Sequence, residues 1–379
     1  MTPLFEIPAE SELRARGSAK WTAFPDAIGA FVAEMDFGIA PVVRRALDAE
    51  LDAARTGYLP AASSAALAEA TAAWSADRYG WPIRPEQVRP VADVLTGLDL
   101  VLRRYSDPSK PVIVPTPAYM PFLTMPGQLG RELVRVPMAR DPWALDLDTL
   151  DDAFRTTGSK LLVLTNPHNP TGRVFTDAEL AAVTELVERH GARVFADEIH
   201  APLTFDGRIH RPYAATSDTA AAHTVTATSA SKAWNLPGLK CGQVILSDEA
   251  SARRWAEVGY LPEHGTATPG VLASTAAYTD GRDWLDEVLA YLDGNRALLR
   301  GADLPGLGVT VPEGTYLAWL DGTGLDLDEP PAAYLAREAG VVLTDGAACG
   351  SPGGMRFNLA MARPVLSEAL DRLGAALRP

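Results

Sequence analysis

The sequence predicts an α/β fold, with a large domain whose mostly parallel sheet is sandwiched by helices and a smaller α/β domain. The chain has 379 residues, which is too many for one ordinary hydrophobic core. Residues 160–196 alternate strand, helix and strand, the order of a parallel βαβ unit. The pattern changes after about residue 270. We therefore expect an N-terminal arm over 1–39 that joins the small domain, a large domain over 40–270 and a small domain over 271–379.

The composition limits the kinds of partner. The formal net charge is −14, which argues against nucleic acid and against an anionic membrane surface. No stretch approaches the roughly 20 apolar residues that span a bilayer, and the N-terminus lacks the pattern of a signal peptide. The two cysteines, Cys241 and Cys349, have no metal-binding spacing and form no disulfide framework. We expect a cytoplasmic protein without a metal site.

The first 115 residues are predicted to form an arm followed by helices. Polar and turn residues dominate 1–35, which we expect to be extended. Pro41 occupies the position of a first helical residue, and Gly57 ends the apolar periodicity that follows it. Thr96 and Gly97 open another helical run, and helix N-termini can bind anions. The predicted elements are helices over 41–56, 64–79 and 96–102 and a strand over 111–115.

The middle of the chain has the clearest pattern. An apolar strand over 160–165 runs into the polar segment Asn166–Gly172. A capping box at Thr176–Glu179 begins a helix, and the returning strand 193–196 runs into Asp197–His200. Ligands of parallel sheets bind at the carboxyl ends of the strands. We therefore expect both polar segments at the binding edge.

Lys232 is the candidate nucleophile. A β-rich run over 224–228 ends just before Ser229 and Lys232, which places both at the same edge. Small polar neighbours and partial burial can lower the pKa of a lysine amine and make it nucleophilic. We expect Lys232 to carry a cofactor as a Schiff base. Later elements are predicted as strands over 243–247, 314–320, 341–344 and 355–360 and helices over 283–301 and 367–377.

The polar segments share an order that resembles the class I/II aminotransferase superfamily, the pyridoxal-phosphate (PLP) enzymes of fold type I. The matching residues are Asn166-Pro-His-Asn-Pro-Thr-Gly172, Asp197-Glu-Ile-His200 and Ser229-x-x-Lys232, with Lys240 eight positions further on. The resemblance covers nearly the whole chain. It implies the PLP-dependent transferase fold of type I.

Further segments resemble the cystathionine β-lyase (C–S lyase) branch of that superfamily. They are Lys20-Trp21, Ala33-Glu-Met-Asp-Phe37, Gly57-Tyr58 and Met355-Arg-Phe-Asn358, together with His200, where ordinary aminotransferases usually have a tyrosine.

The resemblance implies PLP as the cofactor and indicates its contacts. Asp197 would face the pyridine nitrogen, Asn169 the 3′-oxygen, and Tyr119 the ring face, with a buried core position as the alternative for Tyr119. His200 either hydrogen-bonds near the ring or is a satisfied core histidine. The implied phosphate contacts are Thr96, Gly97, Leu98, Ser229, Lys240 and, from the neighbouring subunit, Tyr58.

The resemblance also implies substrate contacts and a partner. Arg356 would bind the α-carboxylate of a small amino-acid substrate through its bidentate guanidinium, with Arg363 as the rival. Tyr119 and Asp36 are the other expected substrate contacts. A Tyr58 that reaches the neighbouring phosphate implies a homodimer with shared active sites, whereas the alternative is a tyrosine that packs locally.

The implied reaction is α,β-elimination. Lys232 would take the Cα proton of L-cystathionine or a related L-cysteine S-conjugate, and a thiol, pyruvate and ammonia would result. The same residues serve transamination, so a class I/II aminotransferase is the alternative; a ligand-sensing module is a third, which the presence of Lys232 disfavours. Glu34, Trp234 and Cys349 depart from residues that are frequent in relatives, and we expect them to border the substrate pocket.

Overall fold

A seven-stranded sheet organises the larger part of the computed structural model, which describes residues 4–258 and 260–378. In order across the sheet its strands are β2 (Val88–Val91), β8 (Gly242–Leu246), β7 (Thr224–Thr228), β6 (Arg193–Asp197), β5 (Leu161–Thr165), β3 (Val112–Thr116) and β4 (Leu133–Pro137). The strands from β7 to β4 pair in parallel, and β8 runs antiparallel to both of its neighbours. The predicted α/β class with a mostly parallel sheet is therefore confirmed.

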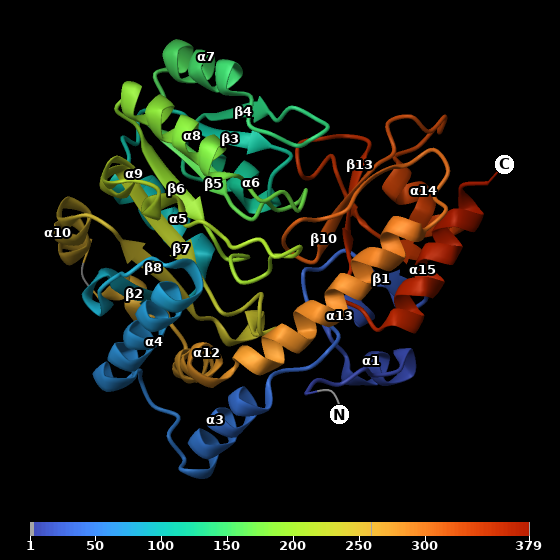
Figure 1. Ribbon diagram of the computed structural model, residues 1–379, viewed down its shortest axis with the longest axis horizontal. Coiled ribbons are helices and arrows are strands. Elements are labelled where there is room, and N and C mark those ends of the chain that lie inside the picture. The colour runs from blue at the N-terminus through green and yellow to red at the C-terminus, as the bar shows by residue number, and fades with distance from the viewer. Residues whose placement is uncertain (1–3, 259, 379) are drawn as a thin grey trace.

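Helices cover both faces of this sheet (Figure 1). Side chains alternate along β5, so Leu162 and Leu164 pack with α7 and α8, while Leu161 and Val163 pack with α5 and α6. All five residues of β5 are buried, as expected for a strand covered on both faces. The helices of this part are α3 (Pro41–Asp52), α4 (Ala61–Tyr79), α5 (Val94–Leu100), α6 (Met120–Gln128), α7 (Leu147–Thr157), α8 (Asp177–Arg189), α9 (Asp218–His223), α10 (Glu249–Val258), α11 (Leu261–His264) and α12 (Thr268–Asp280).

A second, antiparallel sheet lies beside the first, next to the long helix α13 (Figure 1). Its strands, in order, are β12 (Thr344–Asp345), β13 (Gly354–Asn358), β10 (Leu317–Asp321) and β9 (Gly308–Thr310). The accompanying helices are α13 (Arg282–Gly301), α14 (Pro331–Glu338) and α15 (Arg363–Ala376). Single turns are η1 (Pro85–Gln87), η3 (Tyr213–Ala215) and η4 (Pro237–Leu239), and η2 (Val101–Tyr105) is π-helical. Within the described residues, no helix combines the length and apolar character needed to cross a membrane.

The N-terminal arm is more structured than the sequence predicted. It contains α1 (Glu10–Arg16), α2 (Ala19–Thr22) and β1 (Ile28–Gly29), so the expectation of an extended segment over 1–35 is wrong there; residues 1–3 lie outside the described chain. Strand β1 pairs in parallel with β11 (Val341–Val342). Trp21 packs in the hydrophobic core of the second sheet, so contacts distant in sequence fold the arm.

Predicted element boundaries differ from the structure where tertiary contacts decide them. The strand expected from Gly314 begins at Leu317, because the amides of Gly314 and Thr315 bond to the carbonyls of Gly172 and Leu203. The strand expected over 341–344 is divided between β11 and β12, which belong to different sheets. Strands β2 and β4 and helices α7 and α12 were not predicted.

Candidate functional site

A cavity of about 540 Å³ lies at the carboxyl ends of the central strands. Asn169 follows β5, Asp197 ends β6, and Lys232 follows β7, so the parallel sheet brings all three to this cavity. Arg356 of β13 reaches it from the second sheet. Most of the predicted site is thereby assembled in one place.

Lys232 is half-buried at the wall of the cavity. Its Nζ donates a hydrogen bond to the carbonyl oxygen of Ala33 over 2.9 Å. Burial lowers the pKa of Lys232 to about 8, and the positive charge of Arg356 acts in the same direction. A substantial fraction of the amine is therefore neutral near physiological pH, as a nucleophile or a base requires.

Asp197 experiences the opposite effect. It is buried at the end of β6, and its Oδ1 accepts a hydrogen bond from the amide of Ile199 over 3.1 Å. Burial raises the pKa of Asp197 to about 7. A carboxylate in this environment gains most from a cationic group placed against it, such as a protonated ring nitrogen.

Arg356 is held at the side of the cavity with its guanidinium partly engaged. Nη1 donates to Oδ1 of Asn169 over 3.1 Å, and Nη2 donates to the carbonyl oxygen of Phe31 over 2.7 Å. Its buried Nε has no hydrogen-bond partner in the described chain. Arg363, the rival for carboxylate binding, is exposed and lies over the ring of Tyr291, so the geometry favours Arg356.

His200 lines the cavity without a partner. It is buried, and both of its ring nitrogens lack hydrogen bonds within the described residues. Burial lowers the pKa of His200 well below its ordinary value, and the charges of Lys232 and Arg356 act in the same direction. It is therefore not a satisfied core histidine, and the neutral ring is available to a ligand. Tyr119 also lines the cavity, and burial raises its pKa.

The opposite end of the cavity has the features of an anion site. Lys240 and Ser229 line it, and Nζ of Lys240 lies 3.0 Å from Oδ2 of Asp93. Oγ of Ser229 donates to the carbonyl oxygen of Cys241 over 2.6 Å. Asp93 caps α5, whose first residues Val94 and Leu95 line the cavity.

The predicted contacts Thr96, Gly97 and Leu98 do not fit this geometry. Asp93 accepts a hydrogen bond from the amide of Thr96 through Oδ1 and from the amide of Gly97 through its carbonyl oxygen, and Leu98 lies buried inside the helix. The helix begins two residues earlier than the Thr-Gly pair suggested. The first-turn amides that face the cavity therefore belong to Val94 and Leu95.

Tyr58 and Asp36 lie outside the cavity lining. Tyr58 is 87% exposed and packs only locally, with its ring centroid 5.4 Å from that of His264. Asp36 is buried, and its carboxylate accepts from Nζ of Lys20 over 2.8 Å and from Nε1 of Trp21 over 2.9 Å. Direct contact of Asp36 with substrate is thus not supported by its position. It fixes the arm next to the cavity instead.

Three further expectations about the pocket border differ from the structure. Trp234 is buried in the core against Trp74, and Cys349 is buried in a core cluster. Neither side chain is part of the cavity lining, and neither is Glu34. Sequence reasoning instead missed Phe24 and Phe31, because both come from an arm whose fold depends on distant contacts. Val94 and Leu95 were also missed, although Asp93 three positions before Thr96 is an N-cap signal.

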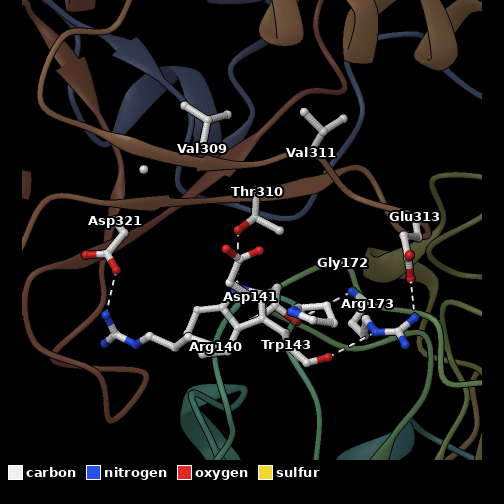
Figure 2. A pocket seen from close by; sticks show the side chains of 13 residues that line it. Arg140, Asp141, Trp143, Gly172, Arg173, Val309, Thr310, Val311, Glu313 and Asp321 are labelled. Carbon is white, nitrogen blue, oxygen red and sulfur yellow. Dashed lines mark hydrogen bonds and ion pairs between the residues drawn. The ribbon is translucent and has the colours of Figure 1, made fainter.

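A second cavity, of about 470 Å³, is lined by Arg140, Trp143, Arg173 and the strand β9 (Figure 2). Figure 2 shows that both arginines are engaged: Nη1 of Arg140 bonds to Asp321 over 2.6 Å and Nη1 of Arg173 to Glu313 over 2.6 Å. Both arginines of this second cavity are already ion-paired, and the described residues that line it include no buried base. We therefore place the candidate site in the first cavity.

The first cavity suits a ligand with a phosphate, a basic ring nitrogen and an aldehyde. Lys240 and the start of α5 suit the phosphate, Asp197 the protonated nitrogen, and Lys232 the aldehyde. The unpartnered nitrogens of His200 and Arg356 are the sort of buried polar atoms that a bound ligand would satisfy. These groups together match PLP carrying an amino acid.

Known proteins are similar to this chain in both sequence and structure. Residues 31–373 match the family described as aminotransferase class I and II. A cystathionine beta-lyase from Corynebacterium glutamicum is 37% identical over 375 residues, which cover 98% of this chain and 100% of the relative.

Two solved structures give the same result. A protein from Corynebacterium diphtheriae, assigned as a PLP-dependent beta-cystathionase, has a TM-score of 0.93 and 37% identity, covering 98% of this chain and 99% of the other. A PLP-bound C–S lyase from Staphylococcus hominis has a TM-score of 0.88 and 28% identity, covering 99% and 97% of the two chains. The chain belongs to the class I and II aminotransferase family of PLP-dependent enzymes, in its cystathionine β-lyase branch.

Proposed function

We propose that this protein is a PLP-dependent carbon–sulfur β-lyase. Its substrate is L-cystathionine or a related L-cysteine S-conjugate, which it cleaves by α,β-elimination to pyruvate, ammonia and a thiol. The observation that carries the proposal is the half-buried Lys232, with a pKa of about 8, in one cavity with Asp197 and Arg356. The relatives named cystathionine beta-lyase and C–S lyase support the same reaction.

The residues of the cavity would hold the cofactor in a defined orientation. Bound PLP supplies an electron sink for the carbanion that forms at the substrate Cα. Asp197 would keep the ring nitrogen protonated, and Tyr119 and His200 would border the ring. Lys240 and Ser229 would bind the phosphate, with the first amides of α5.

Arg356 and Lys232 would act on the substrate. The guanidinium of Arg356 binds the α-carboxylate and fixes Cα within reach of Lys232. The neutral amine of Lys232 would take the Cα proton, the thiolate would leave from Cβ and be protonated to the thiol, and water would hydrolyse the remaining 2-aminoacrylate to pyruvate and ammonia.

We further propose a homodimer with shared active sites. The large side chains of Tyr58, Leu51, Tyr260 and Leu261 are each at least 66% exposed, and Tyr58 and Tyr260 line one surface pocket. A second copy of the chain would cover them and bring Tyr58 to the phosphate end of the adjacent site.

We retain a cytoplasmic location, supported by two free, buried cysteines. We also retain the domain division at residues 39 and 270, and expect no nucleic-acid partner because of the net charge of −14.

The products formed from L-cystathionine test the proposed reaction. The PLP-loaded protein should release pyruvate and homocysteine together, and Lys232→Ala should release neither at a measurable rate. If the product is a 2-oxo acid that retains sulfur, while pyridoxamine phosphate accumulates, the protein is an aminotransferase.

A further inference from the structure

The side of the cavity that would face the substrate side chain is built from the N-terminal arm. Arg356 donates to the carbonyl oxygen of Phe31, and Lys232 donates to that of Ala33. The segment 31–33 therefore runs from the group that binds the carboxylate to the group that acts at Cα. A substrate held by both groups has its Cβ substituent next to this segment.

The surface around that segment is apolar. The ring of Phe24 packs edge-on against Phe31, with centroids 5.3 Å apart at 90°. Strand β11 lies beside the arm, because the amide of Ala30 donates to the carbonyl oxygen of Val342. The apolar lining residues on this side are Phe24, Phe31, Val32, Met120, Val342 and Leu343.

The charged lining residues already have partners or functions at the cofactor end of the cavity. Asp93 and Lys240 form an ion pair at the phosphate end. The proposed mechanism assigns Asp197 to the ring nitrogen, Lys232 to the Cα proton and Arg356 to the α-carboxylate. No other charged side chain of the described residues lines the cavity. A substituent with its own ammonium and carboxylate, as in cystathionine, would therefore be desolvated without a counter-charge from the side chains that line the cavity.

We infer that the cavity is specific for L-cysteine S-conjugates whose leaving thiol is apolar, such as an alkyl or aryl thiol, in preference to cystathionine. This inference rests on the proposed β-lyase function and specifies its substrate class. Burial of an apolar substituent against Phe24, Phe31 and Leu343 is favourable, whereas burial of two unpaired charges opposes binding. These three side chains form an apolar wall of the cavity, and this wall would thus determine which thiol leaves.

The substrate comparison uses the PLP-loaded full-length protein. We expect kcat/KM for pyruvate release from S-benzyl-L-cysteine to exceed that from L-cystathionine by roughly tenfold or more. Equal values, or a preference for L-cystathionine, would overturn the inference while leaving the β-lyase function intact. Failure to release pyruvate from either substrate would instead remove the proposed function.

Two variants test the wall itself. Phe24 is 44% exposed, so Phe24→Arg adds a cation at the mouth without filling a core, and it should shift the kcat/KM ratio toward L-cystathionine by roughly fivefold or more. Ile209→Arg is the matched control, since Ile209 is 72% exposed and does not line the cavity. Phe31→Ala should lower kcat/KM for S-benzyl-L-cysteine selectively. Unchanged ratios in both Phe24→Arg and Phe31→Ala, with normal PLP absorbance, would reject the inference.

Discussion

Burial is the largest cause of the pKa shifts of the two central titratable groups, and it acts on them in opposite directions. It lowers the pKa of Lys232 to about 8 and raises that of Asp197 to about 7, because the charged form of each loses hydration. The cofactor-free cavity therefore contains a partly neutral amine and a carboxyl that needs a cation. Both are properties expected of a site that binds an aldehyde attached to a basic ring.

The first prediction concerns the loading of Lys232. The rate at which the cofactor-free protein binds PLP covalently should rise roughly tenfold per pH unit and level off above about pH 8, since only the neutral amine attacks. An unperturbed lysine would still be accelerating at pH 10. Stopped-flow absorbance measures the rate, with Lys232→Ala as the control. A rate that keeps rising to pH 10 would show that burial does not activate this amine.

The second prediction concerns Asp197. Its folded pKa is above the ordinary value of 3.8, so ionisation opposes folding, and the contribution of Asp197 to the stability of the PLP-free protein should fall as pH rises from about 4 to about 7. At pH 8, Asp197→Asn should therefore melt about 3 °C or more above wild type without PLP, yet lose most elimination activity. Calorimetry without PLP checks this.

A contrasting buried carboxylate provides the control for Asp197. Asp36 is ion-paired with Lys20, and both are buried, so Asp36→Asn leaves a buried ammonium without its counter-charge. That variant should melt below wild type. If both substitutions lower the melting temperature, Asp197 is not the uncompensated charge that its position suggests.

At the scale of elements, the sequence predicted those parts whose patterns are local. The strand 160–165, the capping box at Thr176 and the helix that it begins all appear in the structure, because hydrophobic alternation and capping depend on near neighbours. The carboxyl ends of β5, β6 and β7 therefore placed Asn169, Asp197 and Lys232 together. Parallel strand order explains why these residues could be grouped from the sequence.

The parts that were not predicted depend on contacts between distant segments. Strand β1 exists only through pairing with Val341–Val342, more than 300 residues away, so its periodicity carries no signal. Phe24 and Phe31 reach the cavity through that pairing. The start of α5 was misplaced because Thr96 and Gly97 were taken as its first residues, although Asp93 is the cap. In the N-terminal arm, packing against distant segments determines the structure rather than local propensity.

The third prediction concerns the turn that presents Asn169. Gly172 has a φ of +73°, and a Cβ there would lie 2.3 Å from Cβ of Pro312. Gly172→Ala should lower the free energy of unfolding by roughly 2–4 kcal/mol through strain and overlap. Gly130→Ala is the control, since φ is +70° but no atom lies within 4 Å. Equal losses in denaturant titrations of both variants would show that the overlap with Pro312 is relieved without cost.

At the scale of the whole molecule, the proposed dimer would extend the active site beyond one chain. The cavity receives side chains from the arm, the large sheet and the second sheet, but Tyr58 remains exposed on its own chain. A two-fold symmetric dimer uses the same surface on both copies, so the contact of Tyr58 with the opposite site would occur twice, once for each site. The proposed dimer would thus complete the phosphate end.

The fourth prediction tests shared sites by mixing two inactive proteins. In a heterodimer of Tyr58→Ala and Lys232→Ala subunits, one site receives an intact Lys232 and an intact partner Tyr58, while the other lacks both. Unfolding and refolding the mixture should therefore restore about a quarter of wild-type activity by random pairing. Each variant refolded alone is the control. If the mixture is no more active than its components, Tyr58 does not act across a dimer.

The number of turnovers without an added 2-oxo acid tests the central claim most directly. A β-lyase regenerates its cofactor in every cycle, so the PLP-loaded protein should convert a hundredfold excess of S-benzyl-L-cysteine or L-cystathionine to pyruvate and thiol in a 1:1 ratio. An aminotransferase would stop after about one turnover per site, because its cofactor stays in the amine form. Sustained, equimolar release of pyruvate and thiol is the predicted result. A single turnover that resumes only when a 2-oxo acid is added would contradict it.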